Sequence, residues 1–171
     1  GENNTFLGAY PGEENITGER NTAIGTGAMA LSASANYNVA VGYNALRITE
    51  WGEKNVALGD VTLENNTYGY GNVAVGWAAL NNNIDGSYNI ALGQQCLVSN
   101  EEGDDNIAAG FWSMFYNTIG SENTAYGQRS LFYNTTGSFN CANGSFAMTE
   151  NKTGSYNTAM GHYAGDFREN I

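Results

Sequence analysis

Four acidic residues crowd one short segment of the chain. They flank Gly103 on both sides and are Glu101, Glu102, Asp104 and Asp105. Carboxylate oxygens are the ligands that hard cations such as calcium prefer. The segment has neither EF-hand spacing nor a nonapeptide calcium repeat, so we interpret it as a solvated acidic loop, with a cation site as the alternative. We expect no cofactor.

Aromatic side chains gather a little further along the chain. The stretch 111–133 contains Phe111, Trp112, Phe115, Tyr116, Tyr126, Phe132 and Tyr133. Aromatic rings among asparagine amides suit sugar binding, and the candidate glycan site consists of Trp112, Phe115, Tyr116, Phe132 and Tyr133. Phe115 and Phe132 are 17 residues apart, as are Tyr116 and Tyr133. Stacking of these pairs, or packing against another chain, explains the cluster at least as well.

No catalytic constellation is present in the sequence. The single histidine, His162, has no serine or cysteine nucleophile at a recognisable spacing, and the carboxylates form no repeated pair of the glycosidase kind. Cys96 and Cys141 form neither a disulfide framework nor a zinc pattern, so we expect free thiols. We therefore expect that the protein is not an enzyme.

Composition narrows the classes of protein further. The 171 residues have a formal charge of −11 and include 25 asparagines, 23 glycines and one proline. Neither asparagine nor glycine favours helices, which argues strongly against a helical bundle. The negative charge argues against nucleic acid and anionic membranes as partners. No apolar run approaches the roughly 18 residues that a membrane helix needs.

A repeat of 17 residues organises the chain, because asparagine recurs at this spacing without insertion or deletion and a glycine follows each one four residues later. The repeats begin at Asn4, Asn21, Asn38, Asn55, Asn72, Asn89, Asn106, Asn123, Asn140 and Asn157. Counted from this asparagine as position 1, position 3 is alanine in nine repeats and position 9 is leucine or methionine in eight. We interpret residues 1–171 as a single β-solenoid unit. Asn170-Ile171 reads as the start of another repeat, so we expect the solenoid to continue in a longer chain.

The repeat unit predicts an all-β fold. Three or four β-forming residues end at a glycine, a second short apolar stretch follows, and a polar loop of Asn, Thr and Gly closes the unit. Seventeen residues are too few for a helical repeat and suit one rung of a parallel β-solenoid with two short strands. At about 4.8 Å per rung, ten rungs make a rod of roughly 48 Å.

The recurring residues have structural roles in such a rod. Asparagine at position 1 stacks on the asparagine of the next rung and forms an amide ladder, which we assign to Asn38, Asn55, Asn72, Asn89 and Asn106. Glycine at position 5 suits a corner that needs a positive φ or a close backbone approach. These corners are Gly42, Gly59, Gly76, Gly93 and Gly110. We interpret both sets as scaffold residues rather than ligand contacts.

Strand alternation divides the apolar side chains between two faces. A thin solenoid buries one set, so the other set forms an exposed stripe of the kind that marks an interface. The preferred assignment packs positions 3 and 9 inside and sends positions 2 and 4 to a subunit interface. The swapped assignment also predicts an oligomer. In the preferred assignment the interface residues are Val39, Val41, Val56, Leu58, Val73, Val75, Ile90 and Leu92.

The central repeats resemble a known family. Segments such as Asn38-Val39-Ala40-Val41-Gly42 and Asn72-Val73-Ala74-Val75-Gly76 are similar to the inner-strand motif of YadA-type trimeric autotransporter head domains. Asn21-Thr22-Ala23-Ile24-Gly25 also resembles repeats of bacterial surface and phage tail-fibre proteins. The resemblance implies a left-handed parallel β-roll in which three identical chains pack side by side as the head or shaft of an adhesin or receptor-binding fibre. Family rungs are usually shorter, so the outer loops here are longer.

These observations lead to two functional hypotheses. The first is a structural or adhesive segment of an extracellular surface or virion-fibre protein, which acts as a homotrimer and contacts a host-surface glycan or matrix protein. The alternative is a subunit of a self-assembling extracellular filament, because the open β edges of the first and last rungs can stack end to end. Under both hypotheses we expect this segment to contact neither nucleic acid nor membrane.

Overall fold

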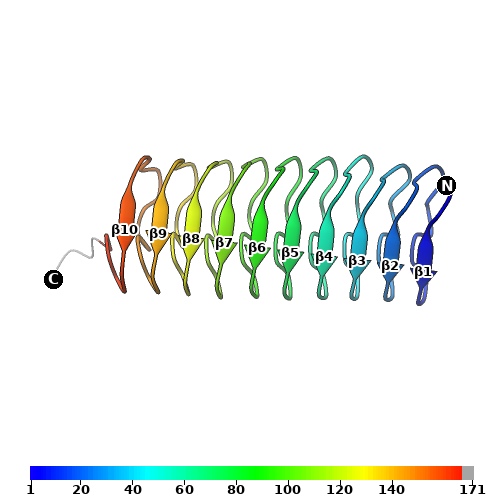
Figure 1. The fold of residues 1–171 in the computed structure, drawn as a ribbon, viewed down its shortest axis with the longest axis horizontal. Helices are drawn as coiled ribbons and strands as arrows, with labels where there is room; N and C mark the ends of the chain where they lie inside the picture. Colours follow the sequence, from blue (N-terminus) through cyan, green and yellow to red (C-terminus); the bar gives the residue numbers. More distant parts are fainter. Residues whose placement is uncertain (167–171) are drawn as a thin grey trace.

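The computed structural model describes residues 1–166, which form an all-β rod. Ten strands of three residues follow one another, one in each rung, and no helix occurs in the described range. Figure 1 shows them side by side along the long axis, from β1 at one end to β10 at the other. They are β1 (Thr5–Leu7), β2 (Thr22–Ile24), β3 (Val39–Val41), β4 (Val56–Leu58), β5 (Val73–Val75), β6 (Ile90–Leu92), β7 (Ile107–Ala109), β8 (Thr124–Tyr126), β9 (Cys141–Asn143) and β10 (Thr158–Met160). The predicted parallel β-solenoid of 17-residue rungs is confirmed, whereas Asn170-Ile171 lies outside the described residues.

The strands form one parallel sheet in which sequence order is also spatial order. Each strand pairs with the next at a shift of 17 residues, so that Val56 lies opposite Val73 and Ala57 lies opposite Ala74. Because the register never slips, each position of the repeat forms a file of side chains along the rod.

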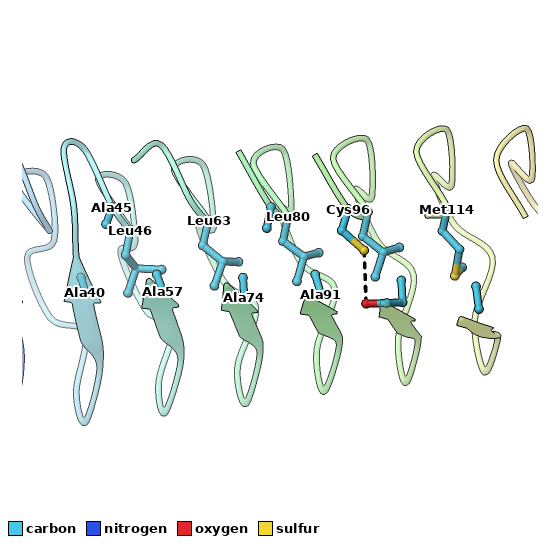
Figure 2. Packing of buried hydrophobic residues seen from close by; sticks show 14 of the residues in the cluster. Ala40, Ala45, Leu46, Ala57, Leu63, Ala74, Leu80, Ala91, Cys96 and Met114 are labelled. Carbon is cyan, nitrogen blue, oxygen red and sulfur yellow. Dashed lines mark hydrogen bonds between the residues drawn. The ribbon is translucent and has the colours of Figure 1, made fainter. Parts of the chain in front are cut away.

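Positions 3 and 9 fill the interior. Ala57, Ala74, Leu63 and Leu80 have no exposed surface, and Figure 2 shows the strand alanines facing this file of leucines. Complete burial of a leucine contributes about 1.5–3 kcal/mol. The residues at positions 2 and 4 point outward and are half-buried or exposed, as the preferred assignment predicts.

The prediction of a second strand in each rung is wrong for residues 1–166. The chain turns at positions 7 and 9, where Ala78 has a φ of 55° and Leu80 a φ of 50°. Contact between rungs continues through single hydrogen bonds, such as the one from the Leu80 N–H to the Cys96 carbonyl at 3.0 Å. Extended backbone at these positions would carry the chain past the point where a 17-residue rung must close. Leu31 and Ile48 form an isolated parallel bridge in this region.

The corner after each strand requires glycine. Gly76 has a φ of 130°, and a Cβ built on it would lie 2.7 Å from the carbonyl carbon of Gly93. Successive corners therefore stack at backbone contact distance, which leaves no room for a side chain.

Candidate functional site: an uncharged strand face

The outward face of the sheet is an apolar surface without charge. None of the thirty strand residues is Asp, Glu, Lys or Arg. On the central strands this face consists of the valines, isoleucine and leucines at positions 2 and 4, and Leu58, Val75 and Leu92 are 37%, 37% and 43% exposed. All eight predicted interface residues therefore lie on one continuous face of the rod.

Exposed aromatic residues flank the strands in the sequence, at positions 6 and 17 of the repeat, where charged residues such as Asp60 and Lys54 also occur. Tyr43 and Trp77 directly follow corner glycines, and Tyr88 directly precedes the asparagine of its rung. We call the outward strand residues, at positions 2 and 4 of the repeat, the strand face. Tyr43, Trp77 and Tyr88 could have been identified only from their positions next to a strand. The residue types at positions 6 and 17 vary from rung to rung, so the repeat pattern does not mark them.

The position 1 asparagines form a hydrogen-bonded ladder inside the rod. The Asn38 Oδ1 accepts the backbone N–H of Asn55 at 2.8 Å, and the Asn38 Nδ2 donates to the Gly52 carbonyl at 2.9 Å. The same two contacts recur at Asn72, whose Oδ1 accepts the Asn89 N–H. From Asn38 to Asn123 each of these amides is buried and bonded on both sides, so the ladder satisfies backbone groups of neighbouring rungs.

A second amide ladder runs through position 12. The Asn83 Nδ2 donates to the Asn66 Oδ1 at 2.7 Å and to the Gly86 carbonyl at 2.7 Å. The Gly86 carbonyl also accepts from Asn72, so one carbonyl oxygen joins the two ladders in that rung. The recurrence of asparagine at position 12 was visible in the sequence, but its shared contact with the first ladder was not.

The five residues of the candidate glycan site come together in space. Phe115 and Phe132 lie 5.5 Å apart between ring centroids, and Tyr116 stacks on Tyr133 at 5.5 Å with an interplanar angle of 8°. Trp112 joins this cluster 5.9 Å from both phenylalanine rings. Residues one rung apart therefore stack along the rod axis.

Trp112 has neighbours on both faces of its ring. Phe111 stacks on it at 4.4 Å, and the Arg129 guanidinium lies 4.5 Å from its centroid. The indole N–H donates to the Gln95 Oε1 at 2.8 Å. Tyr116 and Tyr133 are the most exposed members of the predicted five, at 43% and 37%. A sugar bound here would therefore contact the tyrosines first, and the glycan site stays a prediction.

The four acidic residues of the candidate cation site do not converge. Within residues 1–166 no three His, Cys, Asp or Glu side chains form a group able to hold a metal ion. The Asp104 Oδ1 accepts the backbone N–H of Ser87 at 2.7 Å, so this carboxylate belongs to the connections between rungs. His162 packs against Tyr163, 4.3 Å away between ring centroids, near the end of the described chain.

The two cysteines have different environments. Cys96 is buried, its Sγ donates to the Ala108 carbonyl at 3.2 Å (Figure 2), and burial raises the pKa of the thiol to about 12. Cys141 is half-buried at the start of β9, at an outward position of the strand face. Both are free thiols.

Comparison of the chain with protein-family models, with curated proteins and with solved structures finds no match. No helix in the described part of the chain has the length and apolar character of a membrane span.

Proposed function

We propose that the chain is a structural and adhesive segment of an extracellular surface or fibre protein, and that it works as a side-by-side homotrimer. The observation that carries this proposal is the strand face, which presents Val, Ile and Leu side chains along the rod without an intervening charge. Exposed apolar surfaces of this extent mark interaction sites, and the centres of protein interfaces are depleted of charged residues.

The geometry of the rod supports an identical chain as the partner. All rungs have the same length and register, so the strand faces of two copies match each other along the whole rod. The number three and the extracellular location are parts of the proposal that depend on the resemblance of the Asn-Val-Ala-Val-Gly segments to trimeric surface proteins. The charge of −11 favours neither nucleic acid nor anionic lipid as the partner.

A trimer of rigid rods would present its loops in register along the axis and around it. Weak contacts to a repetitive surface, such as a host glycan or a matrix protein, would then add up through avidity. This arrangement requires no catalytic group, in line with the proposed structural role.

Sedimentation velocity of the 171-residue chain tests the side-by-side assembly. We expect a single closed trimer for the wild type and monomers for the double variant Leu58→Lys, Leu92→Lys, because lysine ammonium groups would have to be desolvated at the interface. The matched control is Ile84→Lys, Ile119→Lys, which changes two similarly exposed apolar residues away from the strands. A monomeric wild type, or equal dissociation of both double variants, would contradict the proposal.

The adhesive part has its own test. If the tyrosine stack binds a glycan, Tyr116→Ala, Tyr133→Ala removes binding on a glycan array, whereas Phe139→Ala, Tyr156→Ala does not. The control pair is stacked in the same way, at 4.8 Å and an interplanar angle of 4°, elsewhere on the rod. Equal binding by both double variants would remove the glycan site from the proposal and leave the trimer untouched.

A further inference from the structure

The guanidinium of Arg129 has aromatic neighbours but no anionic partner among residues 1–166. Its central carbon lies 4.5 Å from the ring centroid of Trp112, 5.3 Å from that of Phe132 and 5.9 Å from that of Phe146. The Nε is buried and has no hydrogen-bond partner in the described chain, and no carboxylate of these residues forms an ion pair with the side chain. Three rings therefore surround a positive charge that no described residue neutralises.

The same part of the rod has no other charged residue over three rungs. The segment that follows the corner glycine covers positions 6–12 of the repeat, and in the sixth to eighth rungs it comprises residues 94–100, 111–117 and 128–134. Arg129 is the only Asp, Glu, Lys or Arg in these three stretches. The local charge of this surface is therefore positive, although the chain as a whole has 17 acidic and 6 basic residues.

The exposed tyrosines of the aromatic cluster lie close to this charge. The Tyr133 ring is 4.7 Å from the Phe132 ring, which in turn contacts the Arg129 guanidinium. Tyr116 stacks on Tyr133, so one face of each ring is covered by the other. Ring edges carry partial positive charge, and phenol hydroxyls donate hydrogen bonds. Both features complement an anion, as the guanidinium does.

The environment of Arg129 favours an ion pair with a ligand. A guanidinium binds a carboxylate or a sulfate through two parallel N–H donors. Because the Arg129 side chain is already half-buried among rings, its attraction to an anion is screened less than that of an arginine in open solvent. The rings also restrict the orientation of the guanidinium, so less side-chain freedom is lost on binding. A neutral sugar would leave this charge unpaired.

We propose that the aromatic cluster selects an acidic glycan, whose carboxylate or sulfate group binds the Arg129 guanidinium while its sugar ring lies against Tyr116 and Tyr133. The inference rests on the proposed adhesive function and deepens it, because it names the class of glycan and the residue that determines specificity. Glu150 follows the two tyrosines at position 11 of the next rung and is exposed. Its carboxylate repels an anionic ligand and limits the affinity.

The test uses glycans that differ only in charge. An array carries carboxylated glycans together with their neutral methyl esters, and sulfated glycans together with their desulfated counterparts. It is probed with the 171-residue chain. We expect the wild type to bind an acidic glycan about tenfold or more tightly than its neutral counterpart, because charge-assisted hydrogen bonds are lost with the charge. The pair that shows the larger difference identifies the anionic group.

Three variants assign the preference to Arg129. Arg129→Met removes the charge and keeps an unbranched side chain among the rings, so it should bind acidic glycans no more tightly than neutral ones. The matched control is Arg20→Met, because Arg20 also lies over an aromatic ring, 5.2 Å from the centroid of Tyr37, and the change in net charge is the same. This control should keep the preference. Glu150→Gln should strengthen the binding of acidic glycans only.

Equal binding of acidic and neutral glycans by the wild type would overturn the inference, as would a preference that survives in Arg129→Met or an equal loss of preference in Arg20→Met. The comparison on the wild type is decisive even where Arg129→Met lowers the melting temperature. Binding without charge preference that is lost in Tyr116→Ala, Tyr133→Ala would keep the glycan site and remove only the inference. An array without any bound glycan would remove both and leave the trimer to its own test.

Discussion

The ring of Phe6 occupies the space in which a side chain at Gly12 would lie, since a Cβ built on Gly12 would be 2.5 Å from the ring. Most other rungs have alanine at position 3 and leucine or methionine at position 9. In the first rung the large residue is therefore at position 3 and the small residue at position 9, the reverse of most other rungs. The interior stays filled in both arrangements. Two departures from the repeat compensate each other.

This exchange predicts a coupled pair of substitutions. Phe6→Ala alone opens a cavity next to Gly12 and lowers the free energy of unfolding by about 1–2 kcal/mol, less than for a fully buried phenylalanine because the Phe6 side chain is 37% exposed. Adding Gly12→Leu recovers most of the loss, because leucine occupies this position with a φ near 50° in other rungs. Chemical denaturation of the four members of the cycle measures the coupling. Additive effects of the two substitutions would refute the compensation.

The position 1 ladder predicts a large effect of a small truncation. Asn72→Ala leaves the Asn89 N–H without its acceptor and removes one of two donors to the Gly86 carbonyl, all in the buried interior. We expect a loss of about 2–4 kcal/mol in the free energy of unfolding. The control is Asn82→Ala, which removes an exposed amide contact to Asn65 and should cost less than about 0.5 kcal/mol. Similar losses in the two variants would mean that the ladder is not a source of stability.

The position 12 ladder is broken where the sequence replaces asparagine by Ser32 and Thr49. Both hydroxyls are buried and have no hydrogen-bond partner in the described part of the chain. Thr49→Asn extends the ladder by one rung and offers an acceptor to the Asn66 amide. We expect the free energy of unfolding to rise by about 0.5–1.5 kcal/mol. The control is Thr67→Asn, which lies next to the ladder but outside it and should not raise the free energy of unfolding. A stabilisation shared by both variants would argue against completion of the ladder.

Cys96 makes stability depend on alkaline pH. Burial raises the pKa of this thiol from 9.0 to about 12, so the folded chain holds the proton more tightly than the unfolded chain. Its contribution is fully present below pH 9 and is lost as the pH rises from 9 towards 12. Between about pH 8 and about pH 10.5, the wild type should lose about 1–2 kcal/mol more than Cys96→Ala. Other rungs have alanine at the position that Cys96 occupies in its rung, for example Ala79. Parallel pH profiles of the two proteins would contradict the assignment.

The repeat made the architecture predictable, because one register determines strand, core and corner together. An alanine such as Ala57 is flanked by outward valine and leucine in the same strand, so alternation alone orients all three residues. The swapped assignment failed because alanine at position 3 faces the leucine file across a thin interior, where a larger residue would not fit beside Leu63.

The turn at positions 7 and 9 was not predictable from residue types. Val61 and Leu63 have φ values of 50° and 51°, although valine and leucine normally avoid this region. Contacts between rungs hold them there, such as the hydrogen bond from the Leu63 N–H to the Ala79 carbonyl at 3.0 Å. Local propensity therefore predicted a second strand at a place where stacked rungs impose a turn. The contacts of Trp112 with Phe111 and Arg129 also depend on side-chain geometry that spacing does not show.

The thiol of Cys141 offers the most direct measurement of whether the strand face is covered. It lies on that face, whereas Cys96 is buried in every assembly and acts as an internal control. The rate of modification by a thiol reagent is measured on the native wild type and on Leu58→Lys, Leu92→Lys. A covered strand face predicts slow modification of Cys141 in the wild type and fast modification in the variant, with Cys96 unreactive in both. Equally fast modification of Cys141 in both proteins would contradict a covered strand face.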